Sequence, residues 1–163
     1  MKIEIVQTNA IASYVGVRAS SLMTNLGSAV SSALQEVVER SNEIANIRNR
    51  EVTYGITPPN YKGNDGLLDF YCCYEVEPLA NVPQGMVHLH LLPRLYSVTY
   101  YRGAASKLVT AYDFTSQWLA ENGYEYDDVS YYLERYDEKT TRETDDERNE
   151  IAIYCPIKKK AVE

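Results

Sequence analysis

Residues 13–44 read SYVGVRASSLMTNLGSAVSSALQEVVERSNEI, a strand pattern that leads into a long amphipathic one. From Ser20 or Ser21 onward, apolar residues recur at the three- and four-residue spacing of a helix that buries one face. These residues are Leu22, Leu26, Ala29, Val30, Ala33, Leu34, Val37 and Ile44. The stretch therefore predicts a strand followed directly by a helix.

Further strands are predicted on both sides of this pair. One near 2–8 continues to 13–18, and two follow at about 52–57 and 67–77, separated by the breaker-rich residues 57–66. The first half of the chain is thus predicted to run strand, helix, strand, strand.

The same order returns after a linker at 78–85 that is marked by Pro and Gly. The predicted elements are a strand near 87–102 that Pro93 can interrupt, a helix from about Ser106 to Asn122 ended by Gly123, and strands near 129–136 and 150–157. We expect the charged loop 137–149 to be mobile.

The repeated order predicts an α+β fold with antiparallel sheets and two main helices. It indicates a single domain over 1–163, built by duplication from one module at about 1–79 and another at about 82–160. A meander with two helices would produce a similar order, and the identity between the halves is weak. A shift of 82 residues aligns Tyr14-Val15-Gly16-Val17 with Tyr96-Ser97-Val98-Thr99 and Tyr54 with Tyr136.

Composition excludes several classes of function. The net charge of -7 and the pI of about 4.9 argue against direct binding of nucleic acid, which needs a basic surface. Three cysteines without a paired spacing fit reduced thiols. The chain has no signal-like N-terminus and no apolar run of membrane-spanning length, so we expect a soluble cytoplasmic protein that contacts no membrane.

Tyrosine is unusually frequent, with 15 residues against two phenylalanines and one tryptophan. Ordinary cores favour Phe or Leu, because a buried phenol must find a hydrogen-bond partner. The excess predicts a surface or cavity that is both apolar and polar.

The predicted strand 129–136 carries the clearest candidate site. Alternation along a strand places Tyr132, Glu134 and Tyr136 on one face, and the even-numbered face of 150–157 adds Tyr154. The odd-numbered faces are mainly aliphatic and suit packing under a helix. Two interpretations remain open: a solvated face with Glu134 as a surface charge, or an aromatic cleft whose one carboxylate attracts a flat or cationic ligand.

Other candidate chemistry is weaker. His88 and His90 point the same way on a predicted strand, as metal ligands can, but no third ligand is evident, so we expect no metal site and no cofactor. Cys72 and Cys73 point to opposite strand faces and are predicted to be small hydrophobic core residues.

Six segments together resemble the GyrI-like effector-binding domains, which also form the C-terminal halves of AraC-type and MerR-type multidrug-sensing activators. The segments are Tyr54-Gly55-Ile56-Thr57-Pro58-Pro59-Asn60, Glu75-Val76-Glu77-Pro78, Val82-Pro83-Gln84-Gly85-Met86, Trp118-Leu119-Ala120-Glu121-Asn122-Gly123-Tyr124-Glu125, Leu133-Glu134-Arg135-Tyr136 and Ile153-Tyr154-Cys155-Pro156-Ile157.

The resemblance implies two strand-helix-strand-strand modules related by a pseudo-twofold axis, with a ligand cavity where they meet. The family's acid falls on Glu134, and its aromatic wall falls on Tyr112, Tyr136 and Tyr154. Strand-face and repeat arguments add Tyr54, Tyr71, Tyr132 and Trp118. The chain departs from the regulators because it has no N-terminal helix-turn-helix, so it is not expected to act on DNA alone.

Three functions are compatible with this resemblance. The first is a small-molecule binder for lipophilic, aromatic or cationic compounds, which sequesters a drug or toxin or reports to an unidentified protein partner. The second is a hydrolase of cyclopropane-bearing antibiotics, with Glu134 as the catalytic acid. The third is a protein inhibitor of DNA gyrase, which would need an interface that the sequence does not identify.

Overall fold

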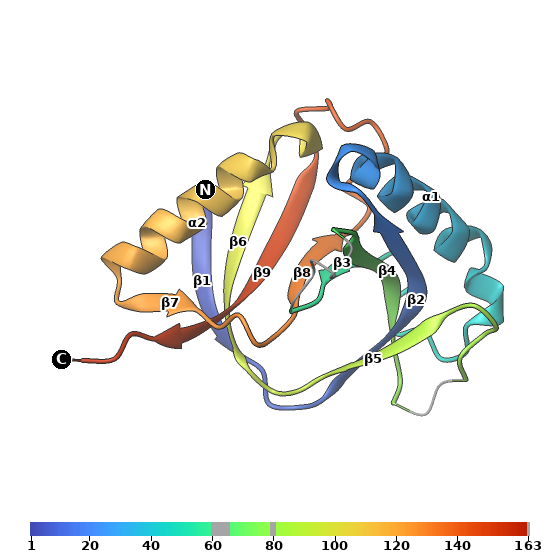
Figure 1. Cartoon of the computed structure of the whole chain (residues 1–163), viewed down its shortest axis with the longest axis horizontal. Coiled ribbons are helices and arrows are strands. Elements are labelled where there is room, and N and C mark those ends of the chain that lie inside the picture. The colour runs from blue at the N-terminus through green and yellow to red at the C-terminus, as the bar shows by residue number, and fades with distance from the viewer. Residues whose placement is uncertain (60–65, 79–80, 163) are drawn as a thin grey trace.

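The computed structural model describes residues 1–59, 66–78 and 81–162. The described chain contains two α-helices and an antiparallel sheet (Figure 1). The helices are α1 (Leu26–Glu39) and α2 (Val109–Glu121). The strands are β1 (Lys2–Gln7), β2 (Ala12–Ser21), β3 (Thr53–Thr57), β4 (Leu68–Val76), β5 (Val87–Leu91), β6 (Leu95–Arg102), β7 (Tyr124–Tyr126), β8 (Tyr132–Tyr136) and β9 (Glu150–Lys159). The predicted α+β class is confirmed.

The order of strands across the sheet is symmetric about its centre. It runs β1-β6-β9-β8-β3-β4-β2-β5, with β7 paired to β9. Reversing the order exchanges β6 with β2, β9 with β4 and β8 with β3, so the two strand-helix-strand-strand units are related by a pseudo-twofold axis between β3 and β8. Figure 1 shows α1 and α2 on opposite sides of the molecule, with β3 and β8 between them.

The outermost strands are exchanged between the two units. β1 pairs with β6 of the second unit, and β5 pairs with β2 of the first. The prediction that the strand near 2–8 continues into 13–18 is therefore wrong. Residues 8–11 connect β1, at one edge of the sheet, to β2, which lies next to the opposite edge.

The first helix begins later than the sequence predicts. β2 extends to Ser21 because Ser20 and Ser21 pair with Asp69 and Leu68 of β4, and a short 3-10 turn at Met23–Asn25 precedes α1. The helix ends at Glu39, so Ile44 lies beyond it, although its side chain is buried.

Both helices cover the same face of the sheet. α1 packs on β2 and β4 through Val37 and Ala33, which join a core cluster with Val17 and Cys72. α2 packs on β6 and β9, where Ala111 joins a cluster with Ile151, Ile153 and Cys155. A third cluster lies on the opposite face of the sheet and contains Tyr14, Ile56, Cys73, Leu91, Tyr96, Val98 and Leu133.

The second half follows its predicted boundaries with two differences. Pro93 lies in the break between β5 and β6, and Gly123 follows the C-cap of α2 with a left-handed φ of 79°. The short strand β7 was not predicted. The predicted strand at 129–136 begins only at Tyr132.

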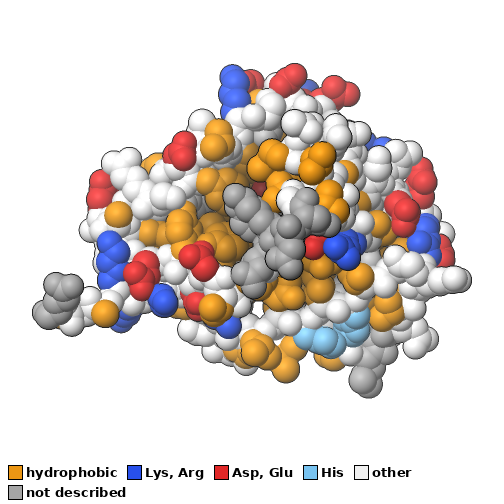
Figure 2. Space-filling view, in the orientation of Figure 1, with side chains coloured by type: hydrophobic (Ala, Val, Ile, Leu, Met, Phe, Trp, Pro, Cys, Tyr) orange, Lys and Arg blue, Asp and Glu red, His pale blue; other side chains and the backbone are white. Residues whose placement is uncertain are grey.

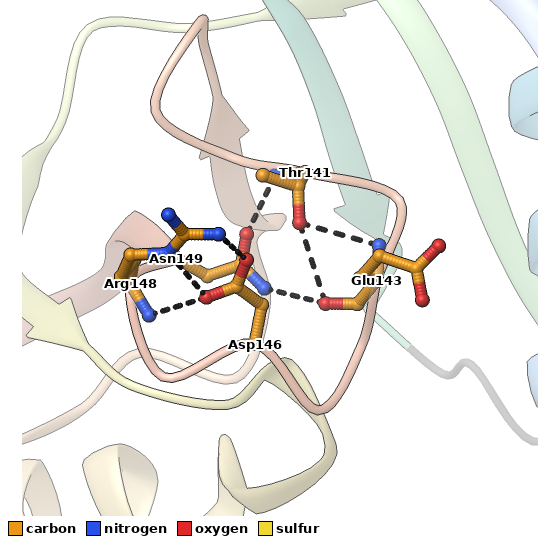
Figure 3. A network of polar contacts seen from close by, with 5 residues as sticks. All are labelled: Thr141, Glu143, Asp146, Arg148 and Asn149. Carbon is orange, nitrogen blue, oxygen red and sulfur yellow. Dashed lines mark hydrogen bonds and ion pairs between the residues drawn. The ribbon is translucent and has the colours of Figure 1, made fainter.

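The charged loop 137–149, which we expected to be mobile, is closed by hydrogen bonds (Figure 3). The buried Asn149 side chain accepts from the Thr141 backbone N–H at 2.5 Å and donates to the Glu143 carbonyl at 2.9 Å. Asp146 accepts from Arg148 on both carboxylate oxygens. One amide side chain at the end of the loop thus holds residues 141 and 143 within it.

Candidate functional site

The register of the sheet places Glu134 in the gap between the two helices. Directly paired residues point to the same face of an antiparallel sheet. One such row crosses the sheet as Val17, Cys72, Gly55, Glu134, Ile153 and Thr99. α1 covers the first end of this row and α2 covers the last, so Gly55 and Glu134 lie at the middle of the helix-bearing face. Figure 2 shows hydrophobic side chains gathered around a hollow between α2 and the centre of the molecule.

Two phenols donate hydrogen bonds to the Glu134 carboxylate. The Tyr112 hydroxyl, from α2, lies 2.8 Å from Oε1, and the Tyr136 hydroxyl, from the same strand as Glu134, donates to Oε2. Burial raises the pKa of the Glu134 carboxyl above its ordinary value, and the two hydrogen bonds oppose this effect only in part. The pKa values of Tyr136 and Tyr112 are also raised, first by burial and then by the negative charge of Glu134.

Glu134 is a partly buried acid that has no cationic partner among the described residues. In the ranges that the structure describes, Glu134 forms no ion pair with Lys or Arg, whereas its strand neighbour Arg135 pairs with Asp137 at 2.9 Å. A desolvated carboxylate whose only partners are neutral hydroxyls is under-compensated. The site can therefore gain free energy from a cation.

Gly55 makes room for the aromatic side chains around this acid. A Cβ atom at this position would lie 2.5 Å from Cζ of Phe70 and 2.8 Å from the Tyr136 hydroxyl oxygen. Gly55 and Glu134 are also the middle residues of β3 and β8, so the pseudo-twofold axis relates them. Counted by the 82-residue shift, the counterpart of Glu134 is Val52, whereas the register of β3 and β8 pairs Glu134 with Gly55, so this alignment does not hold at the centre.

Two buried thiols flank the acid without being reactive. Burial raises the pKa of Cys72 to about 12 and that of Cys155 to about 12, and the nearby Glu134 charge adds to both shifts. Thiols with such pKa values stay protonated, so they act as small hydrophobic groups. Cys72 and Cys73 point to opposite faces, as predicted.

Three predicted tyrosines lie on the same face as Glu134. Tyr112 and Tyr136 contact the carboxylate directly. Tyr132 is two residues away on β8, where its hydroxyl donates to Asp128 at 3.0 Å and its ring packs against Tyr126. The sequence thus brings three of the predicted aromatic residues to this face.

Tyr154 does not share a face with Glu134, and that prediction is wrong. Tyr154 pairs directly with Leu133, so the even-numbered residues of β9 lie with the odd-numbered residues of β8. Tyr54 pairs with Arg135, and Tyr71 pairs with Ile56, which places both on the Tyr154 side as well. These three tyrosines belong to the face without helices.

Trp118 lies further along α2. Its ring stacks on Tyr124 of β7 with the centroids 6.1 Å apart and the planes 14° apart. Six residues separate it from Tyr112, which is about 9 Å along a helix axis. The structure therefore shows no contact between Trp118 and Glu134.

Sequence reasoning missed Gly55 and Phe70 as parts of this site. The alternation of Leu68, Phe70, Cys72 and Tyr74 along β4 was available as a signal, because it assigns Phe70 to one face of that strand. Which neighbour this face meets depends on the pairing of β4 with β3.

The histidine pair forms no larger cluster of metal ligands. His88 and His90 have ring centroids 4.1 Å apart, and Nδ1 of His90 lies 3.1 Å from the Ser13 hydroxyl. Within residues 1–59, 66–78 and 81–162 there is no group of three or more His, Cys, Asp or Glu side chains placed to hold a metal ion.

Neither described helix is long and apolar enough to cross a membrane.

Comparison with known proteins agrees with this geometry. The model of the GyrI-like small molecule binding domain matches residues 1–158. The transcriptional regulator BrlR of Pseudomonas aeruginosa is 27% identical over 135 residues, which cover 80% of this chain and 47% of the regulator, so the chain spans about half the length of this curated relative.

Two solved structures share the fold. SAV2435, solved bound to tetraphenylphosphonium, superposes with a TM-score of 0.70 at 16% identity and covers 97% of this chain and 94% of its own. The EcmrR C-terminal domain superposes with a TM-score of 0.68 at 13% identity, and the match covers 97% of this chain and 98% of that domain. With a family model that spans nearly the whole sequence, the chain belongs to the GyrI-like family of small-molecule-binding domains.

Proposed function

We propose that this domain binds a hydrophobic aromatic cation in the hollow between α2 and the centre of the molecule, with the Glu134 carboxylate as the counter-charge. The observation that carries the proposal is the absence of a cationic partner for Glu134 within the described chain, where its hydrogen bonds come from Tyr112 and Tyr136. The neighbouring rings would supply apolar contact and cation–π attraction. The related fold of SAV2435, solved with tetraphenylphosphonium, supports a ligand of this class.

The charge of the ligand is the property to test. Tetraphenylphosphonium and tetraphenylborate have nearly the same shape and opposite charge. We expect calorimetry to show binding of the phosphonium and little binding of the borate, because a buried carboxylate repels an anion. Glu134→Gln should weaken phosphonium binding by about 1–3 kcal/mol, the usual size of a lost charge-assisted contact.

Glu39→Gln is the matched control, because it removes the same charge from an exposed position on α1. Its phosphonium affinity should equal that of the wild type. Equal affinities for Glu134→Gln and wild type, or equal binding of phosphonium and borate, would show that Glu134 does not select cations.

The same acid favours a second candidate function, hydrolysis of a cyclopropane-bearing compound. The raised pKa of Glu134 keeps a proton available in the site. That proton would pass to one ring carbon as the ring bond breaks, while water adds to the other carbon and returns a proton to the carboxylate. A product heavier by one water, formed by wild type and not by Glu134→Gln, would identify this activity.

A further inference from the structure

A separate cavity of about 110 Å³ opens on the face of the sheet that carries no helix. It lies where the chain crosses between the two units, beside the segments that join β1 to β2 and β5 to β6. Its lining residues are Thr8, Ala10, Ala12, Tyr14, Tyr54, Leu91, Leu92, Tyr96, Leu133 and Tyr154. We call this space the tyrosine cavity.

The walls of the tyrosine cavity contain two edge-to-face pairs of rings. Tyr14 and Tyr54 have centroids 5.1 Å apart with planes at 75°, and Tyr96 and Tyr154 have centroids 6.1 Å apart with planes at 82°. Such pairs hold aromatic side chains in defined orientations. The walls are therefore preorganised.

The floor is held by a reciprocal set of hydrogen bonds. The Thr8 backbone N–H donates to the Arg94 carbonyl at 2.9 Å, and the Arg94 backbone N–H donates to the Thr8 hydroxyl at 2.8 Å. Arg94 also pairs with Asp127 at 2.6 Å. These contacts fasten the two crossing segments to each other.

Two tyrosine hydroxyls in this wall are unpaired within the described chain. Tyr54 is oriented by Arg135, and Tyr96 by Ser130, whereas no described residue hydrogen-bonds to the hydroxyl of Tyr14 or Tyr154. Neither hydroxyl is among the buried side-chain atoms without a partner in the described chain, which are His88 Nε2, Arg94 Nε and Ser97 Oγ. These two hydroxyls are available to a ligand that carries an acceptor.

Among the described residues, the lining of the tyrosine cavity bears no charged side chain, which distinguishes it from the Glu134 site. Glu75 and Arg135, which carry opposite charges, act on Tyr54 from outside this lining, so a ligand in the cavity would not touch either group. An ion placed here would therefore lose its hydration without a counter-charge in direct contact. Two lining residues, Ala12 and Leu91, pair with each other, and their chain neighbours Ile11 and Leu92 are exposed. The exposed fraction is 51% for Ile11 and 60% for Leu92. The entrance is thus apolar as well.

We propose that the tyrosine cavity is a second ligand site, and that it takes one neutral aromatic ring bearing a hydrogen-bond acceptor. A cavity of about 150 Å³ encloses benzene, so this smaller space of about 110 Å³ holds at most one ring, which its open mouth leaves partly exposed. The site lies back to back with the Glu134 site, because Leu133 and Glu134 point to opposite faces of β8.

Fluorine NMR with para-fluoroacetophenone as the probe tests this site. We expect saturable binding to the wild type and loss of binding in Ala10→Phe, which fills the entrance from an exposed position. Tyr154→Phe should lower the affinity for this probe by about fivefold, while the affinity for fluorobenzene, which has no carbonyl acceptor, changes by less than about twofold. No saturable binding, or equal binding to Ala10→Phe, would overturn the proposal.

The two ligand sites are distinguished by crossed controls. Glu134→Gln should bind the fluorinated probe as the wild type does, and Ala10→Phe should bind tetraphenylphosphonium as the wild type does. Failure of cation binding therefore leaves the tyrosine cavity testable. Binding of N-acetyl-phenylalanine amide without binding of the free ring would assign the cavity to a protein partner and overturn the small-molecule proposal.

Discussion

The Glu134 carboxyl experiences two opposing influences on its pKa. Burial raises the pKa because it removes water from the charged form, while hydrogen bonds from Tyr136 and Tyr112 lower it because they stabilise that form. The burial effect is the larger one, so the folded protein binds the proton more tightly than the unfolded chain. The charged form of this residue therefore lowers stability at neutral pH.

The raised pKa predicts how stability depends on pH. Protonated Glu134 contributes stability that is fully present when the pH is below 4.5, the ordinary pKa of a glutamate. This stability is lost as the pH rises through the raised pKa of the folded state. Glu134→Gln does not titrate, so its stability relative to the wild type should increase from about pH 4 to about pH 8. Urea unfolding of both proteins across this range measures the difference. A difference that is independent of pH would contradict a raised pKa.

At the scale of elements, the pairing of β3 with β8 builds the centre of the site. Both strands are five residues long, and Gly55 and Glu134 occupy their middle positions opposite each other. The glycine lets the Phe70 ring and the Tyr136 hydroxyl come close to the strand. A short strand with no side chain at its centre thus positions an acid that lies on its neighbour.

Gly55→Ala should test this arrangement. The added methyl group would overlap Phe70 and Tyr136, so we expect a loss of about 1–3 kcal/mol in the free energy of unfolding, as for overpacked cores. Phosphonium binding should weaken too, because Tyr136 must move away from Glu134.

Gly27→Ala provides the matched control for this substitution. Gly27 lies in α1 with open space around its Cβ position, so alanine there should stabilise the protein by up to about 1 kcal/mol. Urea unfolding compares both variants with the wild type. Equal effects at the two glycines would mean that Gly55 is not required by its neighbours.

For the whole molecule, charge and symmetry define the surface that is available to partners. The net charge is -7, and the basic residues near the C-terminus are partly neutralised, since Lys158 lies 3.7 Å from Glu125 of β7. The symmetric sheet places one helix over each half and leaves the centre of that face between the two helices. Neither feature provides the continuous basic surface that DNA requires.

We therefore predict that this chain does not bind duplex DNA specifically. Fluorescence anisotropy with labelled duplexes should show at most weak binding that disappears as salt is raised, because any contact would be a counterion effect. The unlabelled duplex in excess serves as the competition control. Nanomolar binding that persists at high salt would contradict the prediction.

Local patterns in the sequence predicted most of the elements. Helical spacing identified α1, and Gly123 marked the end of the second predicted helix, α2. The family resemblance and the α+β class were also confirmed. The start of α1 was placed too early, because Ser20 and Ser21 form sheet pairs with β4 that no local pattern reveals.

The sequence by itself determined the order of most helices and strands, the family, and the position of Glu134 between tyrosines on one strand. Periodicity and side-chain alternation are local properties, which a single segment displays. Only the tertiary structure decided that Tyr154 pairs with Leu133 and that β1 and β5 exchange edges. Cross-strand register depends on partners distant in the chain, and a shift of one residue moves every side chain to the other face of the sheet.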